Sequence, residues 1–213
     1  MPKVPSTAVR RMLIERAAEM LARREPVTLR SVVAGTGAST MAVYTHFDGM
    51  PGLWRAVRQE GFTRLATELG AVQPTGDPVR DLVAYGAAFM SNALAHPALY
   101  RAMFDAGFDL EDPAAANASF EVLVSCAARA RDGGRFAPHT DPGAVATRFW
   151  AFGHGLAMLV LTGVLPVDVL DDHVVPVATA MFVAAGDEEA RCRRSARAGW
   201  LKTQGGRSTR RSR

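Results

Sequence analysis

The chain has 213 residues, nearly half of them hydrophobic, and a formal net charge of +4. This length and composition favour a folded, soluble protein with a substantial core. No apolar run approaches the roughly 20 uncharged residues of a membrane helix, and the start of the chain lacks a signal peptide's apolar core, so we expect a cytoplasmic protein without a membrane partner. Two cysteines, Cys126 and Cys192, are too few for a disulfide framework and lack metal-site spacing.

Charge is distributed unevenly along the chain. Residues 1–60 carry a net charge of +4, residues 61–190 carry −9, and residues 191–213 hold nine basic and no acidic residues. A basic end is typical of a surface that faces a polyanion, and an acidic body of one that faces water or small molecules. An uneven surface without function explains the same pattern, so charge alone leaves both readings open.

The spacing of apolar residues predicts an all-α fold of about nine helices. Strand alternation is rare, whereas apolar residues recur at three- and four-residue steps. A first amphipathic helix ends before Pro26. Further helices are expected near 78–95, 98–107, 114–132, 141–163 and 170–186.

Two short helices are predicted between the first helix and Pro51. Thr28 can cap a helix at 29–34, which stops at Gly35-Thr36-Gly37. Ser39 can cap another that runs to about Phe47, and Pro51 suits the first turn of a fourth helix. Two short helices joined by a glycine-containing turn form a helix-turn-helix, which places its second helix in the DNA major groove.

The second short helix has a polar and aromatic outer face. If it spans 39–47, its outer face includes Thr40, Met41, Tyr44 and Thr45. Tyr44 and His46 can donate hydrogen bonds to phosphate oxygens, whereas Thr40 and Met41 lie near the helix start, where side chains reach base edges. Arg30 is a candidate for guanine, and the amide ends at Thr28 and Ser39 can each bind a phosphate.

The segment TLRSVVAGTGASTMAVYTHFDGMPGL resembles the DNA-binding domain of the TetR family of transcriptional regulators. The matching pattern is Gly37-x-Ser39, then Val43-Tyr44-x-His46-Phe47, then Leu53, and the resemblance covers about residues 8–60. It implies contact with operator DNA by Thr28, Arg30, Ser39, Thr40, Met41, Tyr44, Thr45 and His46.

One residue departs from the family pattern. Met50 stands where family members usually carry a phosphate-binding lysine. The loss of this charge is expected to weaken backbone affinity by about 1 kcal/mol and to lower the salt slope by about one unit. Arg55 or Arg58 can compensate, although either can equally be a solvated helix residue.

A second landmark, RFWAFGHGL at 148–156, resembles the Trp-x-x-x-His-Gly signature of the WHG subgroup of TetR regulators. Trp150 and His154 share a helix face and can line an effector pocket, although a histidine satisfied within the core is an equal alternative. The two glycines cost about 1 kcal/mol each in a helix, which predicts close packing or a cavity beside them.

An apolar effector cavity is expected in the larger half of the chain, lined by aromatic and methionine side chains. Each of these residues alone is more typical of plain core. The effector-site residues we predict are Phe89, Met90, Met103, Phe104, Phe108, Trp150 and His154. Tyr100, Leu123 and Cys126 are further candidates for the cavity wall.

The last two long helices, near 141–163 and 170–186, are apolar on more than one side. This surplus predicts a subunit interface, and in the resembling family these helices form a four-helix bundle about a twofold axis. A homodimer then presents two recognition helices to a palindromic operator. The expected organisation is a helix-turn-helix domain at 1–50, a connecting helix at 51–72, a regulatory and dimerisation domain at 73–190, and a basic, disordered tail at 191–213.

Other functional classes fit less well. No nucleophile elbow, H-E-x-x-H pair or phosphate loop appears, so we expect neither catalysis nor a cofactor. The acidic cluster Asp171-Asp172-His173 is typical of a helix N-terminus rather than of a metal site. The sequence therefore predicts a repressor that a small apolar effector releases from DNA. The alternative is an architectural or protein-partner-controlled DNA-binding protein without a small-molecule effector, and the tail is either a weak polyanion-binding arm or a solubilising segment.

Overall fold

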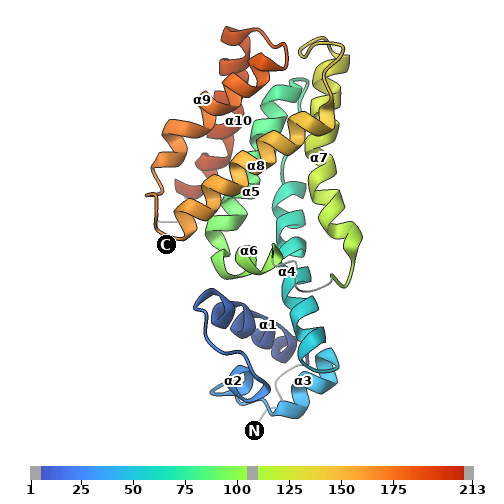
Figure 1. Ribbon diagram of the computed structural model, residues 1–213, viewed down its shortest axis with the longest axis vertical. Coiled ribbons are helices and arrows are strands. Elements are labelled where there is room, and N and C mark those ends of the chain that lie inside the picture. Colours follow the sequence, from blue (N-terminus) through green and yellow to red (C-terminus); the bar gives the residue numbers. More distant parts are fainter. Residues whose placement is uncertain (1–5, 105–109, 209–213) are drawn as a thin grey trace. The chain divides into compact units, whose positions relative to one another are not determined.

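The computed structural model describes the backbone of residues 6–104 and 110–208, and side chains within residues 7–104 and 110–201. These ranges contain ten helices and no strand (Figure 1). The helices belong to two compact units. Unit 1 comprises the chain up to Arg64 together with His96–Ala116, and unit 2 comprises Leu65–Ala95 and the chain from Asn117.

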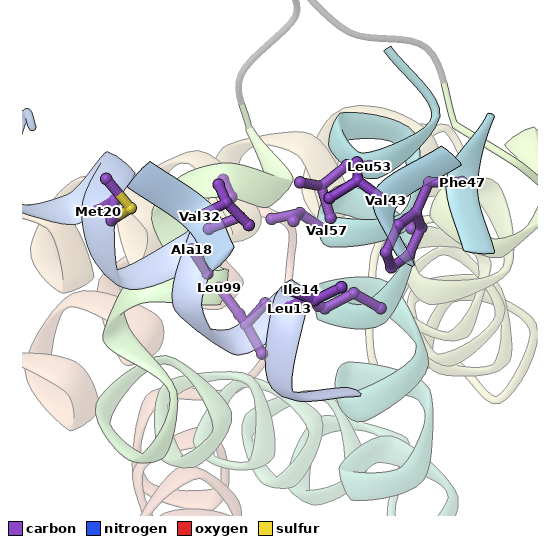
Figure 2. Packing of buried hydrophobic residues seen from close by; sticks show 13 residues of the cluster. Leu13, Ile14, Ala18, Met20, Val32, Val43, Phe47, Leu53, Val57 and Leu99 are labelled. Atoms are coloured by element: carbon purple, nitrogen blue, oxygen red, sulfur yellow. The ribbon is translucent and has the colours of Figure 1, made fainter. Parts of the chain in front are cut away.

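Unit 1 contains the N-terminal helices and one helix from further along the chain. Its elements are α1 (Ser6–Ala22), α2 (Leu29–Val33), α3 (Thr40–Phe47), the first part of α4 (Met50–Gly70) and α6 (Pro97–Met103). Leu13, Val32 and Val43 are fully buried and converge on one cluster with Leu53 and Leu99 (Figure 2). This core fixes α2 and α3 against α1 and α4.

Helix α6 is part of this first unit because it completes the unit's core. Leu99 and Ala102 of α6 belong to the same buried cluster as the side chains of α1, and Arg101 donates a hydrogen bond to the carbonyl of Ala22 at 3.3 Å. The sequence-based division places this segment with the regulatory domain. Packing instead joins it to the helix-turn-helix, although 31 residues of unit 2 separate α6 from the end of the first stretch of unit 1.

Unit 2 is built from the remaining helices. They are α5 (Pro78–Ala95), most of α7 (Pro113–Asp132), α8 (Pro142–Leu161), α9 (Val169–Ala184) and α10 (Glu189–Ser208). Helix α10 packs along α5 and α9, and α8 packs against the same two helices (Figure 1). Gly86 of α5 permits the close approach of the Phe149 ring from α8, since a Cβ there would lie 2.8 Å from Phe149 Cζ.

The expected disordered tail at 191–213 is wrong over the residues that the structure describes. Residues 189–208 form α10, and its Cys192, Ala196 and Trp200 side chains are buried. These residues recur at four-residue steps and give the helix a narrow apolar stripe. Gly199 lets this stripe approach α5 closely, because a Cβ there would lie 2.3 Å from the carbonyl oxygen of Arg80. Residues 209–213 lie outside the described residues.

A buried polar cluster joins the loops of unit 2. Arg135 donates hydrogen bonds to both carboxylate oxygens of Asp187 at 2.7 and 2.6 Å and to Asp77 at 2.8 Å. Ser195 of α10 donates to Asp77 at 2.6 Å. Because Arg135 and Asp187 are both almost wholly buried, this bidentate geometry offsets the cost of removing two charges from water.

Helix α8 is long and apolar enough to cross a membrane by length and composition alone, and it is the one such helix in the described ranges. It carries Arg148 and contributes Val145, Ala146, Phe149 and Leu156 to the buried core of unit 2. The apolar character of α8 is therefore partly accounted for by packing within unit 2.

Candidate nucleic-acid interface and effector site

Helix α2 begins with a complete capping box. The Thr28 hydroxyl oxygen accepts a hydrogen bond from the backbone N–H of Ser31 at 3.1 Å, and the Ser31 hydroxyl accepts one from the backbone N–H of Thr28 at 2.8 Å. The predicted cap at Thr28 is therefore confirmed. Its side chain fixes the start of α2, and Arg30 is exposed in the first turn.

The turn between α2 and α3 depends on glycine. Gly35 and Gly37 have φ values of +74° and +75°, a region that residues with a Cβ rarely adopt. The Thr36 hydroxyl donates to the carbonyl of Val33 at 2.7 Å and accepts from the N–H of Ala38. These contacts fix the direction in which α3 leaves the turn.

Helix α3 turns one face into the core and the other to solvent, as its periodicity predicts. Val43 and Phe47 are buried, whereas 65% of Met41 and 50% of Tyr44 are exposed. Ser39 and Thr45 are also exposed, and Thr40 and His46 are half-buried. Exposure of a methionine and a tyrosine on an eight-residue helix is unexpected for a surface that meets only water.

The hydroxyl groups of Ser39 and Thr45 bear on the DNA contacts predicted for α3. Ser39 occupies the N-cap position, but its side chain accepts no cap hydrogen bond, so the N-terminal amides of α3 are not satisfied by that hydroxyl. The Thr45 hydroxyl donates to the carbonyl of Met41 at 2.9 Å. Thr45 must therefore rotate its hydroxyl before it can donate to a phosphate.

The end of α3 lies close to the start of α4, as the predicted helix bounds imply, but the glycine-dependent contact between them was not predicted. Asp48 and Gly49 have φ values of +56° and +97°, which reverse the chain within two residues. A Cβ on Gly52 would lie 1.6 Å from the Phe47 carbonyl oxygen, so only glycine fits there. The Tyr44 ring lies near Gly49, where a Cβ would be 3.6 Å from Tyr44 Cε1. This bend limits the orientations open to the Tyr44 side chain.

Met50 is the first residue of α4 and packs at the edge of the unit 1 core. The two arginines proposed to compensate for it differ in their contacts. Arg58 Nε donates to the carbonyl of Met103 at 2.8 Å, which ties its guanidinium to α6. Arg55, half-buried on the same helix, is therefore the better remaining candidate for a phosphate contact.

In unit 2, the predicted effector residues Trp150 and His154 lie together. Their ring centroids are 5.8 Å apart, and the Phe120 ring of α7 lies 6.2 Å from Trp150. Burial lowers the pKa of His154 below its usual value of 6.5, which favours a neutral imidazole. Phe89 is half-buried and Met90 is buried in α5, and Leu123 and Cys126 are buried in α7.

The other predicted effector residues lie elsewhere. Met103 and Tyr100 are fully buried in unit 1, and the Phe104 ring lies 5.1 Å from the ring of Tyr100 and 6.3 Å from that of Phe62. Phe108 lies outside the described residues. Burial raises the pKa of Cys126 to about 11, so its thiol is protonated near neutral pH. The predicted effector set is thus divided between the two units.

The glycines of the RFWAFGHGL segment lack the predicted close neighbours within the described part of the chain. A Cβ at Gly153 or Gly155 would have no atom within 4 Å. Gly155 is exposed, in line with the exposed Ala151 and Leu159 on the same face of α8. Among the described residues of one chain, nothing therefore requires glycine at either position.

A cavity of about 180 Å³ in unit 2 involves residues that the sequence analysis did not single out. Ala84 and Ala88 of α5 form its apolar side, and Glu68, Arg80 and Asp81 supply charged groups. The Asp81 carboxylate is already bound by Arg129 at 3.0 Å and by the Thr75 N–H. Among the described side chains there is no group of three potential metal ligands.

Comparison with known proteins points to one family of regulators. Residues 82–185 match the family model of the tetracyclin repressor-like C-terminal domain. The chain is 28% identical over 193 residues to the uncharacterized HTH-type transcriptional regulator Rv0681 of Mycobacterium tuberculosis, a match that covers 86% of this chain and 84% of the relative. These matches support a TetR family transcriptional regulator. The prediction made from the 8–60 segment is confirmed, while membership of the WHG subgroup stays a prediction.

Solved structures, among them that of a TetR family protein, share the fold of this chain. CprB of S. coelicolor A3(2) superposes with a TM-score of 0.71 at 18% identity, covering 92% of this chain and 98% of CprB. RolR in complex with resorcinol superposes with a TM-score of 0.55 at 19% identity, covering 90% of this chain and 94% of RolR. At these identities the likeness establishes the all-α fold alone.

Proposed function

We propose that this TetR-family regulator is a homodimeric repressor that binds a palindromic operator through α2 and α3 and is released by a small apolar effector. The observation that carries the proposal is the outer face of α3. Met41 and Tyr44 are exposed opposite the buried Val43 and Phe47, and the hydrogen-bonded turn before α3 fixes the direction of that face.

Each predicted contact residue has a distinct role in this proposal. Tyr44 and His46 donate to phosphate oxygens and set the register, while Thr40 and Met41 reach base edges near the helix start. Arg30 reads guanine from α2. Ser39, whose hydroxyl does not cap α3, leaves the helix amides available to a phosphate, and Thr28 and Thr45 support the backbone contact.

Dimerisation is proposed through α8 and α9. Ala151, Gly155 and Leu159 are exposed at four-residue steps on α8, and Pro176, Ala180 and Ala184 are exposed at the same spacing on α9. Small side chains let helices of two subunits approach closely. A partner helix on this face also supplies the close neighbour that Gly155 lacks within one chain.

The effector is proposed to bind beside the Trp150–His154 pair in unit 2, with Phe89 and Met90 as neighbouring apolar wall residues. RolR, a structural neighbour, binds resorcinol, and an aromatic ring suits the aromatic side chains here. An effector that binds one conformer more tightly lowers DNA affinity by the difference between its two binding free energies. The proposed site of action is the cytoplasm.

A gel-shift series on the chain's own upstream DNA tests the proposal. Tyr44→Ala and Arg30→Ala are each expected to weaken operator binding by about 1–3 kcal/mol. Thr7→Ala, which changes an exposed residue of α1, serves as a control expected to bind normally. Unaltered binding by both contact variants would remove α3 from the interface. Selection of bound sequences from random DNA should return a palindrome, and a non-palindromic preference would contradict the dimeric repressor.

A further inference from the structure

The solvent-facing side of α10 carries a row of arginines. Arg191, Arg193, Arg194 and Arg197 are all exposed, and no acidic residue follows Glu189 in the sequence. We propose that the arginine face of α10, defined as Arg191, Arg194 and Arg197, is a second binding surface for the phosphate backbone of double-stranded DNA, separate from α3.

The arginine face and the buried face of α10 divide the helix cleanly. The three arginines follow at three-residue steps and therefore lie along one side. The opposite side is held within unit 2: Trp200 Nε1 donates to Asp171 at 2.9 Å, and Cys192 and Ala196 are fully buried. The packing of α10 thus fixes the arginines in a preformed row.

These arginines are not explained by the stability of the helix. Arg191–Arg194 and Arg194–Arg197 are like-charge neighbours, which disfavour a helix by a few tenths of a kcal/mol per pair at such spacings. Arg191 also lies in the first turn of α10, where the helix dipole disfavours a cation. Glu189 lies 3.9 Å from Arg193, and hydrogen bonds from the backbone N–H groups of Ala190 and Arg191, followed by the charges of Arg194 and Arg191, lower the pKa of Glu188. No described carboxylate lies within 4.0 Å of the guanidinium groups of Arg191, Arg194 and Arg197, so none of the three is held in an ion pair. A row of like charges that is not held in ion pairs is typical of a functional surface.

Double-stranded DNA fits this surface better than a membrane does. A basic amphipathic helix binds a lipid surface by inserting its apolar side chains, but Cys192, Ala196 and Trp200 of α10 are already buried against α5 and α9. Apart from the exposed Leu201, this side of α10 offers mainly charge, and a row of charges suits regularly spaced phosphates. As a DNA-binding regulator, the protein meets this polyanion when α3 docks.

The test measures the affinity of the full chain for a random-sequence duplex without an operator, as a function of salt. The variant R191Q/R194Q/R197Q is expected to bind at least about tenfold more weakly at low salt, with a slope of log affinity against log salt reduced by about two to three. The matched variant R191K/R194K/R197K keeps the charges and should retain the wild-type slope. Thermal melts establish that α10 stays folded in both variants.

The outcomes separate this surface from the recognition helix. Tyr44→Ala should lose operator selectivity yet keep the α10 contribution to the salt slope. A wild-type slope in the glutamine variant overturns the proposal, as does a glutamine variant that loses binding only to phosphatidylglycerol vesicles or polyglutamate. If every α3 variant kept its operator selectivity, the proposed function would be refuted, whereas the proposal for the arginine face would not be affected.

Discussion

Arg64 donates a hydrogen bond from Nη1 to Nδ1 of His96 at 3.2 Å. A guanidinium can only donate, so Nδ1 accepts in this bond and a neutral His96 carries its proton on Nε2. The same guanidinium bonds Glu60 of α4 at 2.8 Å and Glu15 of α1 at 2.9 Å. Arg64 is the last residue before the chain leaves unit 1, and His96 is the first after it returns. One side chain therefore connects α1 to both places where the chain passes from one unit to the other.

Replacement of Arg64 by Met should lower the free energy of unfolding by about 1–3 kcal/mol, because three hydrogen bonds to partly buried groups are lost. Urea denaturation followed by circular dichroism measures the change. Arg55→Met removes the same chemical group from a half-buried position of the same helix. It should cost clearly less, and equal losses would show that the Arg64 contacts contribute nothing of their own.

Substitution of Trp200 by Ala should destabilise the protein by about 3–5 kcal/mol, since the indole is buried and bonded to Asp171. The neighbouring change Leu201→Ala, at a side chain that is 53% exposed, should stay within about 0.5 kcal/mol. Denaturant titration of both variants gives the comparison. A negligible effect at Trp200 would restore the disordered tail expected from composition.

Acidification should weaken unit 2 through Asp77. Burial raises the pKa of this carboxyl, but hydrogen bonds from Ser195 and the Arg80 N–H and the charge of Arg135 outweigh burial and hold its pKa below the usual 3.8. Its contribution is present above pH 3.8 and is lost as pH falls through the folded-state pKa, because the unfolded chain binds the proton first. Thermal melts of Asp77→Asn should show lower stability near neutral pH and a flatter acid limb than the wild type. An equal loss of stability with falling pH in Asp77→Asn and the wild type would contradict this role.

The Met50→Lys variant should bind operator DNA more tightly. Met50 lies at the start of α4 beside the end of α3, and a lysine stem can keep the partial packing while its ammonium reaches a phosphate. The salt slope is expected to steepen by about 0.9 for each subunit's added contact. Anisotropy titrations over a range of salt concentrations measure this, with Met50→Gln as the uncharged control. An unchanged slope in the lysine variant would place residue 50 away from the DNA backbone.

Gly155→Arg should convert a dimer to a monomer without unfolding the chain. A side chain at Gly155 has open space within one chain, but the charge would be placed in the proposed α8–α9 interface. Light scattering gives the oligomeric state, and circular dichroism checks the fold. Gly70→Arg, also open within the chain and exposed, is the control expected to leave the dimer intact. A dimeric Gly155→Arg protein would exclude this face as the interface.

Local chemistry carried much of the prediction. Thr28, Gly35 and Gly37 determine the start of α2 and the turn through capping and positive φ, and both effects are readable from neighbouring residues. The periodicity of α3 likewise predicted that Tyr44 would be exposed and Val43 buried. The predicted helix at 78–95 coincides with α5, because Pro78 marks its first turn.

Contacts between residues far apart in the sequence could not be predicted in this way. Composition marked the 191–213 segment as a disordered tail, yet three apolar residues at four-residue steps suffice once Gly199 allows α10 to touch α5. Gly52 offered no local sign that its missing Cβ accommodates the Phe47 carbonyl. The effector residues other than Trp150 and His154 were grouped by their aromatic and methionine side chains alone, which cannot separate Met103 of unit 1 from Met90 of unit 2.

The assignment of α6 to unit 1 has a consequence for building hybrid regulators. A DNA-reading head cut out as residues 1–64 would leave behind Leu99 and Ala102, and the side chains of α1 that they cover would face water. A functional graft onto another TetR regulator therefore has to transplant His96–Ala116 along with the N-terminal helices. The head is a module in space but not in sequence, and its exchange requires three junctions, at 64/65, 95/96 and 116/117.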